Sequence, residues 1–287
     1  MALSIGIDYS VNSWQTCLME NGQVLALSTF GDAQATFSYV KQICASYPEP
    51  IITLSIPLQT TFGPFLNVAS ASELSQNDLK EFLIAANEIN LRSYSLPAIK
   101  YLPGIPHYRK LNRSDMGSSD QLCAVATLLY RMRKQEAAWS EMRFLYLEAD
   151  YTSRCITVIQ DGCIVDGIRK TPTIDSAIYG DMTEAEQEKL LEQAFWEGLA
   201  QDLAGLMALH HFEDIVMGNT CSSASDSALK DAVIDGLGDT YQLYLFPGSQ
   251  SEQEGFETAI GAAIIAEGLY RPGLAAEVTQ RLLSPLA

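Results

Sequence analysis

Short runs in which apolar and polar residues alternate open the chain and predict three β-strands. The dipeptide Asn21-Gly22 lies between the second and third runs, and it suits the positive φ angles of a two-residue hairpin turn. Asp32 then precedes apolar residues that are spaced by three or four, which predicts a capped helix. The predicted strands are residues 3–9, 13–20, 23–30 and, after the helix, the buried run 51–57.

Two capping signals predict further helices in the first half of the chain. Ser75 is followed by Asp78 and begins a helix that runs to about residue 90, and Ser118 is followed by Gln121 and begins another. The proline-rich stretch 97–106 between these helices is expected to form a loop or an edge strand.

The same order of elements returns in the second half, with Asp161-Gly162 as its hairpin turn. Asp8 lies 14 residues before Gly22, and Glu148 lies 14 residues before Gly162, so each half places an acid at the end of its first strand. A chance alignment of two common turns is the alternative, but the repeated order favours a duplicated βββαβαβα unit. The second half is predicted to contain strands 143–148, 154–160, 163–168, 214–218 and 241–246 and helices 183–210, 224–236 and 254–269.

The net charge bears on the partners of the protein, and the cysteines bear on its compartment. Thirty-five acidic residues against 18 lysines and arginines give a formal charge of −17, which repels phosphate backbones and anionic lipid head groups. We therefore expect no nucleic-acid partner and no membrane partner. The six cysteines contain no CxxC pair, and the amino terminus lacks the basic start and apolar stretch of a signal peptide. A cytoplasmic protein with free, buried thiols is expected.

The histidines and the basic residues suggest no separate site. The three histidines have no metal-ligand spacing to the cysteines, which argues against zinc, and the pair His210 and His211 is expected only to close a helix, where it complements the helix dipole. The stretch PHYRKLNR at 106–113 is expected to be a solvated loop, with steering of an anionic substrate as the alternative.

Two such units packed side by side leave a cleft, and clefts between domains are where small ligands bind. In an acidic protein, phosphate groups need backbone N–H donors or a metal ion, so small polar residues beside a carboxylate can hold a magnesium nucleotide. The segment IGIDYSVNS meets this requirement. Asp8 could hold Mg²⁺ directly or through water, and the main chain around Tyr9, Ser10 and Asn12 could cradle phosphate oxygens.

Four segments, in this order, are similar to motifs of the actin-like ATPases, the superfamily of sugar and acetate kinases, heat-shock chaperones and actin. IGIDYS resembles the first phosphate motif, LEADYTSRCITVIQDGCIVDG the second, IVMGN the adenosine motif, and FETAIGAAIIAEGL the crossing helix of small residues. In that helix, Gly261 is expected to be small for close helix packing. The nearest resemblance, over residues 112–126, 162–167 and 259–269, is to a family of unknown function allied to acetate and butyrate kinases.

The resemblance implies an α/β fold with a duplicated ribonuclease H-like architecture, in which two mixed-sheet domains enclose a cleft. Residues 1–139 would form the first domain, joined by the C-terminal helices at 256–287, and residues 140–255 would form the second. ATP and Mg²⁺ are the implied cofactors, and a small molecule is the implied substrate.

The resemblance also assigns roles to single residues. Asp8 and Glu148 would organise the metal ion, with Asp8 also counted as catalytic. Asp115, preferred over Asp120, would be the general base that takes a proton from an acceptor hydroxyl, or would align a carboxylate acceptor through the metal. Nucleotide contacts are expected from Tyr9, Ser10, Asn12, Asp150, Thr152, Gly218 and Asn219.

The second phosphate motif departs from that of active relatives, which usually carry glycines directly after the acid so that the chain can approach the γ-phosphate. Ala149, Asp150 and Tyr151 stand there instead, and Asn219 follows Gly218 in the adenosine motif. The candidate residues also have structural explanations, namely a turn cap for Asp8, helix capping for Asp115 and Asp120, and strand ends for Glu148 and Thr152.

The expected function is an ATP-dependent phosphotransferase or ATP hydrolase that acts on a small polar or carboxylate substrate. The alternative is a non-catalytic relative that keeps the scaffold for dimerisation or partner binding, which the degenerate phosphate loops favour. The sequence leaves open whether the protein forms a homodimer. A hydrolase that uses Glu148 and Asp150 comes third, because the fold-level signals point elsewhere.

Overall fold

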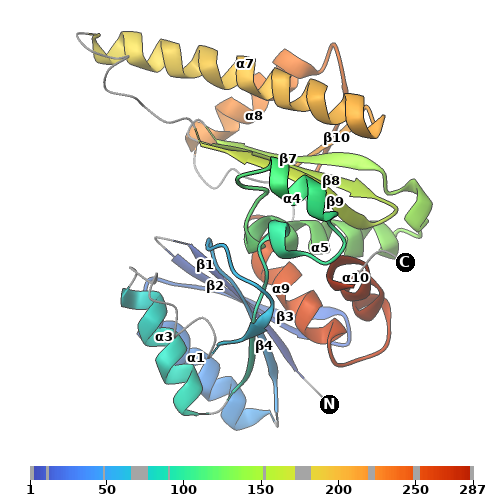
Figure 1. Ribbon diagram of the computed structural model, residues 1–287. Helices are drawn as coiled ribbons and strands as arrows, with labels where there is room; N and C mark the ends of the chain where they lie inside the picture. The colour runs from blue at the N-terminus through green and yellow to red at the C-terminus, as the bar shows by residue number, and fades with distance from the viewer. Residues whose placement is uncertain are drawn as a thin grey trace.

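The computed structural model describes residues 3–10, 13–47, 49–65, 77–89, 91–150, 153–171, 182–218, 224–247 and 253–284. Two mixed β-sheets lie one above the other in Figure 1, with helices on their outer sides and a further layer of helices between them. We call the sheet formed in the first half of the chain, with its outer helices, the first lobe. The sheet of the second half, with its outer helices, is the second lobe.

The first sheet has the strand order β3-β2-β1-β4-β6-β5. β1 pairs antiparallel with β2, and β2 with β3, whereas β4 runs parallel to both β1 and β6. The strands are β1 (Ser4–Ser10), β2 (Ser13–Glu20), β3 (Gln23–Phe30), β4 (Ile51–Ser55), β5 (Gly63–Pro64) and β6 (Arg92–Ser95).

The second sheet repeats this pattern in the order β11-β10-β7-β8-β9. Its first three strands form antiparallel hairpins, and β10 runs parallel to both β7 and β11. The strands are β7 (Phe144–Asp150), β8 (Ser153–Gln160), β9 (Cys163–Lys170), β10 (Asp214–Met217) and β11 (Gln242–Leu245).

A constant shift of 140 residues relates the opening strands of the two sheets: β7, β8 and β9 begin and end 140 residues after β1, β2 and β3. Asn21 and Asp161 have φ of 51° and 53°, and Gly22 and Gly162 have φ of 72° and 74°. Both turns therefore have the left-handed residues that two-residue hairpins require. The predicted hairpins and the duplicated unit are confirmed.

The helices divide into two outer layers and one central layer (Figure 1). The outer helices pack on the first sheet in one hydrophobic core and on the second sheet in another, and a third core lies between the sheets. The outer helices are α1 (Ala33–Ser46) and α3 (Asn77–Glu88) in the first lobe and α7 (Glu184–His210) and α8 (Ala224–Leu237) in the second. The central helices are α5 (Ser119–Lys134), α9 (Glu257–Gly268) and α10 (Leu274–Leu283).

The alternation of side chains along β1 and β7 decides which residues face the central layer. In β1, Ile5 and Ile7 lie in the outer core of the first lobe, so Gly6 and Asp8 face inward. In β7, Leu145 and Leu147 lie in the outer core of the second lobe, whereas Tyr146 belongs to the central core. Asp8 and Glu148 therefore lie near the ends of their strands, on the two inner faces.

Most predicted elements are present, and the differences concern the stretch 97–106 and several short additional elements. The stretch 97–106 is neither a plain loop nor an edge strand, because Ile99–Tyr101 forms a 3₁₀ helix and β5 takes the edge position. The Asp78 carboxylate accepts hydrogen bonds from Trp14 and from the Ala33 backbone, and the predicted cap at Ser75 lies outside the described residues and stays a prediction. The elements that were not predicted include β5, β6 and α4 (His107–Asn112), whereas α9 and α10 lie within the C-terminal helices expected at 256–287. The predicted boundary between residues 139 and 140 falls between α5 and β7 and stays a prediction.

The basic stretch differs from expectation, whereas the histidine pair closes α7 as predicted. Residues 107–112 form α4, and Arg109 and Arg113 lie 3.7 Å and 3.6 Å from the buried carboxylate of Asp166 on β9. His210 is buried and lies 3.2 Å from the same carboxylate, whereas His211 ends α7 with a φ of 60°. These arginines therefore attach α4 to the second lobe, and a role in steering substrate is not supported.

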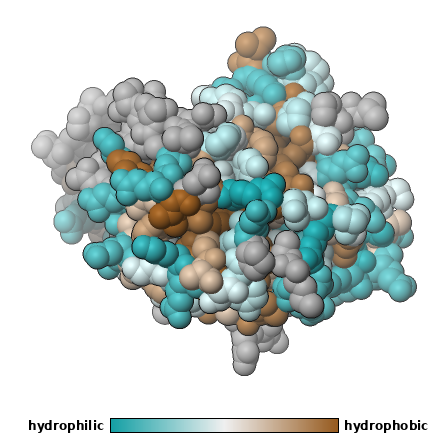
Figure 2. All heavy atoms as spheres, turned by 90° about the horizontal axis from the view of Figure 1, so that it is seen from below, coloured by the Kyte–Doolittle hydropathy of each residue, from teal (hydrophilic) through white to brown (hydrophobic). Residues whose placement is uncertain are grey.

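The outer surface mixes polar and apolar side chains. Figure 2 shows apolar residues gathered near the middle of the face seen from below, surrounded by polar ones. In the ranges that the structure describes, none of the helices is both long and apolar enough to cross a membrane.

Candidate active site

The amino-terminal end of α5 lies where the two lobes meet. Ser118 caps the helix, and the predicted capping box is confirmed, because the Gln121 side chain accepts from the Ser118 backbone N–H at 2.9 Å. The Ser119 hydroxyl donates to the carbonyl of Ile56 and accepts from its N–H, both at 2.8 Å. These bonds hold the first turn of α5 against the end of β4 in the first lobe.

This first turn brings Asp120 close to the acids that end β1 and β7. Burial raises the pKa of Asp8 to about 7, and the charges of Asp120 and Glu148 raise it as well, against a hydrogen bond with Ser55. Burial also raises the pKa of Glu148 to about 7, again with the charge of Asp120 adding to it. Three carboxyl groups from two strands and a helix therefore share one partly desolvated space.

Neutral donors hold these carboxylates in place. The amide of Gln121 donates to Asp120 and to Glu148, both at 2.8 Å, and the Tyr146 hydroxyl donates to Glu148 at 2.6 Å. Arg169 on β9 donates to the Ser118 hydroxyl, and its charge lowers the pKa of Glu148. Among the described residues, little positive charge therefore balances the carboxylates, and this suits a site that receives a cation.

A small pocket of about 130 Å³ opens beside Glu148. It lies between the start of α5 and the β7–β8 hairpin, and Arg169 is the one basic residue among the described residues that line it. Its lining comprises Asp120, Gln121, Glu148, Ala149, Asp150, Ser153, Cys155 and Arg169. The volume is too small for a nucleotide and suits a phosphate group with its ion.

The three carboxylates suit a magnesium ion that is bound together with a phosphate group, rather than a magnesium ion held by protein ligands alone. Across the described ranges, no three His, Cys, Asp or Glu residues are close enough to hold a metal ion on their own. Magnesium usually keeps several waters and takes one or two protein carboxylates together with substrate phosphates. Asp8, Asp120 and Glu148 are oxygen donors of this kind, and Asp8 with Glu148 remains the pair that we expect nearest the ion.

Asp115, in the turn before α5, has hydrogen-bond partners of its own. Its carboxylate accepts from the Gly117 N–H at 2.9 Å and from the Gln59 amide at 3.0 Å, which is a turn-capping arrangement. Asp120, the second choice for the general base, is the one that lies beside Asp8 and Glu148. The preference for Asp115 is therefore not supported by the geometry.

The predicted nucleotide contacts are brought together only in part. The ring of Tyr9 packs on Trp14 in the outer core, so only its main chain could reach a phosphate. Ser10 bonds to Ser13 and closes the β1–β2 loop. Gly218 lies beside Glu148, because an added Cβ there would be 2.6 Å from Glu148 Cγ. Asn12, Thr152 and Asn219 lie outside the described residues.

Asp150 occupies the position where a glycine was expected, and it closes the β7–β8 hairpin. Its carboxylate accepts from the Ser153 N–H at 2.6 Å and from the Ser153 hydroxyl at 2.9 Å. Ala149 and Asp150 also line the small pocket. A phosphate that entered this pocket would therefore meet a carboxylate as well as the guanidinium of Arg169.

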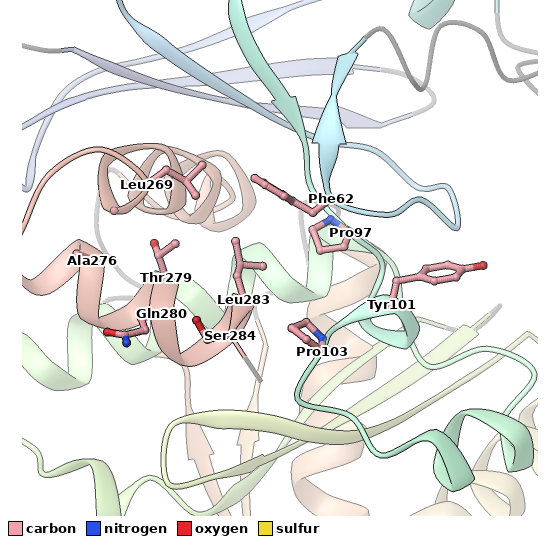
Figure 3. Close-up of a pocket in the computed structure, with 11 residues that line it drawn as sticks. Phe62, Pro97, Tyr101, Pro103, Leu269, Ala276, Thr279, Gln280, Leu283 and Ser284 are labelled. Carbon is pink, nitrogen blue, oxygen red and sulfur yellow. The ribbon is translucent and has the colours of Figure 1, made fainter. Parts of the chain in front are cut away.

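A larger groove of about 460 Å³ lies elsewhere, between the loops around Phe62 and Pro97 and the helices α9 and α10 (Figure 3). Among the residues that the structure describes, its lining shares no member with the small pocket and includes no charged side chain. Phe62, from the loop after β4, contributes to it. The groove does not have the chemistry of a phosphate site.

Sequence reasoning identified Asp8, Asp120 and Glu148 but missed the residues that hold them. Gln121 was recognised only as part of a capping box, and neither Tyr146 nor Arg169 was singled out. One available signal was the period of two in β7, which places Tyr146 on the same face as Glu148. The contact of Arg169 with the start of α5 had no local signal.

Known proteins resemble this chain in part of its sequence and in its fold. Residues 59–194 match the sequence model of a family described as "Protein of unknown function (DUF1464)", and no curated protein matches the chain in sequence. A propionate kinase from Francisella tularensis subsp. tularensis SCHU S4 is similar in structure, with a TM-score of 0.56 and 11% identity over 91% of this chain and 99% of that chain. The chain has the actin-like ATPase fold.

A second structure with this fold is a protein from Listeria monocytogenes described as a candidate N-acetylmannosamine kinase. It has a TM-score of 0.51 and 13% identity, over 91% of this chain and 97% of that chain. The predicted resemblance to the actin-like ATPases is thus confirmed at the level of the fold. At these identities, likeness extends to the fold alone.

Proposed function

We propose that the protein is an ATP-dependent phosphotransferase or ATP hydrolase of the actin-like type that uses Mg²⁺ and acts on a small polar or carboxylate substrate. One observation carries the proposal: the acids that end the equivalent strands β1 and β7 both face the space between the lobes, and Asp120 joins them there. Carboxylates that converge with Arg169 as the one basic side chain in the described lining are expected at a site that binds a metal–phosphate complex.

Each carboxyl group has a distinct part in this proposal. Asp8 and Glu148 would hold the magnesium ion from opposite lobes, directly or through water. Asp120 would align the acceptor or the attacking water, because it lies at the first turn of α5 beside both acids. Bound magnesium would neutralise charge on the phosphate oxygens, and catalysis of this class relies mainly on positioning and charge stabilisation.

The second candidate is a non-catalytic scaffold with the same fold that binds a partner or a second copy. The Asp150–Ser153 contacts favour it, since they place a carboxylate where a γ-phosphate would approach the second hairpin. Binding of Mg-ATP decides between the two candidates. The compartment is proposed to be the cytoplasm, on the free cysteines among the described residues.

Thermal unfolding with and without Mg-ATP tests the proposal. A ligand at 100 times its Kd adds about 2.7 kcal/mol to the free energy of unfolding, so we expect the melting temperature to rise by about 5 °C. The rise should need magnesium and disappear with EDTA. Asp8→Ala should abolish it, whereas Asp32→Asn, which replaces one helix cap by another, should keep it.

Two outcomes of the same experiment would contradict parts of the proposal. If the melting temperature of native protein is the same with and without millimolar Mg-ATP, the non-catalytic scaffold is favoured. A full rise in the Asp8→Ala variant would leave nucleotide binding intact and remove Asp8 from the metal site.

A further inference from the structure

The side-chain amide of Gln121 is the direct connection between the acid on α5 and the acid on β7. Its Nε2 atom lies 2.8 Å from Asp120 Oδ2 and 2.8 Å from Glu148 Oε2. An amide nitrogen carries two N–H groups, so each carboxylate receives one of them. Gln121 is itself 5% exposed, and water therefore competes little for these bonds.

The orientation of this amide is determined by its other end. Gln121 Oε1 accepts from the Ser118 backbone N–H at 2.9 Å, as the capping box requires. The opposite orientation would place the amide oxygen against two carboxylates and leave the Ser118 N–H facing an NH₂ group. The capping box thus directs both N–H donors toward the space between the lobes.

The bond from Gln121 to Glu148 connects the central helix α5 to the second lobe. The first turn of α5 is held to the first lobe by Ser119, which bonds to Ile56 at the end of β4. Glu148 lies near the end of β7, the central strand of the second sheet. Any separation of the lobes at this point must lengthen the bond from Gln121 to Glu148.

We infer that Gln121 is a positioning residue that holds Glu148 of the second lobe in register with Asp120 on the first turn of α5, and so sets the spacing of the carboxylates that receive the metal–phosphate complex. The role in receiving that complex rests on the proposed function. A neutral amide suits the task, because a lysine or arginine would neutralise the carboxylates and compete with the ion. The loss of partners that orient metal ligands typically weakens metal binding by 10-fold to 100-fold.

Two variants separate this role from helix capping. Gln121→Glu keeps the capping box, because glutamate is a favoured partner of a serine cap, but it removes both N–H donors. Gln121→Met removes the donors and the box. Gln135→Glu, at the exposed carboxyl-terminal end of the same helix, adds the same charge away from the site and is the matched control.

The first measurement needs no ligand. Hydrogen exchange of the metal-free protein should be faster in Gln121→Glu, both in the first turn of α5 and at the end of β7, and unchanged in Gln135→Glu. Faster exchange at β7 cannot come from lost capping, since β7 lies in the other lobe. Native protection at β7 in Gln121→Glu would overturn the inference, whether or not the protein binds nucleotide.

The second measurement is the affinity for Mg-ATP by calorimetry. Both Gln121 variants should bind at least about tenfold more weakly than native protein, with no change in Gln135→Glu. Native affinity in Gln121→Glu would overturn the inference while leaving the proposed function in place. Absence of binding by native protein would instead reject the proposed function, and the exchange measurement would then decide the role of Gln121 on its own.

Discussion

Replacing Gly261 by alanine is expected to lower the free energy of unfolding by about 3 kcal/mol or more. Gly261 lies on α9, and a Cβ atom there would be 1.8 Å from the carbonyl oxygen of Cys123 and 2.4 Å from its carbonyl carbon. Both atoms belong to the backbone of α5, so no side chain can move aside. The two central helices would have to separate, and overpacking of this kind costs 1–3 kcal/mol or more. Urea unfolding at 25 °C measures the loss.

Gly205→Ala is the matched control, because Gly205 lies in α7 and an added Cβ there has no neighbour within 4 Å. It should stabilise the protein by up to about 1 kcal/mol, the usual gain from glycine to alanine inside a helix. If the free energy of unfolding of Gly261→Ala lies within about 0.5 kcal/mol of that of native protein, α5 and α9 do not approach each other as closely as the structure indicates.

The hairpins and the duplication could be predicted because their signals are local. A two-residue turn needs left-handed backbone angles, so Asn21-Gly22 and Asp161-Gly162 indicate both the turn and the register of the flanking strands. Once the register is known, the period of two places Asp8 and Glu148 on equivalent faces. The same holds for the starts of α1 and α5, where capping residues mark the boundary.

The elements that were missed depend on contacts between distant parts of the chain. β6 is only four residues long, and its sequence RSYS has no apolar alternation; pairing with β4 makes it a strand. α4 is attached to the second lobe by Arg109 and Arg113, which reach Asp166. Local pattern predicts neither arrangement, because each partner is remote in sequence.

The choice between Asp115 and Asp120 shows the same limit within the site. Both acids flank the same four residues, and either could cap a helix or act as a base. The deciding fact is the direction of each side chain: Asp115 turns back to the N–H of Gly117, whereas Asp120 lies beside the acids of both strands. The number of residues between two acids does not determine this direction.

Replacing Asp8 by asparagine is expected to stabilise the metal-free protein at pH 8 by about 2 to 4 kcal/mol. The pKa of Asp8 is raised by burial from 3.8 to about 7, so between these values the folded chain retains a proton that the unfolded chain has released. The free energy of unfolding therefore falls as the pH rises from about 4 to about 7. Each pH unit between the two pKa values corresponds to about 1.4 kcal/mol, and asparagine removes this loss.

Urea unfolding in EDTA at pH 4.5 and pH 8 should reveal the effect as a gain for Asp8→Asn that is small at the lower pH and large at the higher. Native protein and the variant should both retain some dependence on pH, because burial raises the pKa of Glu148 to about 7 as well. Asp32→Asn, which keeps a good helix cap on an exposed turn, should match native protein at both values. A variant that is no more stable than native protein at pH 8 would mean that Asp8 is compensated in the folded chain. The interpretation that the folded protein loses stability because it keeps a buried carboxylate available for a cation would then no longer be supported.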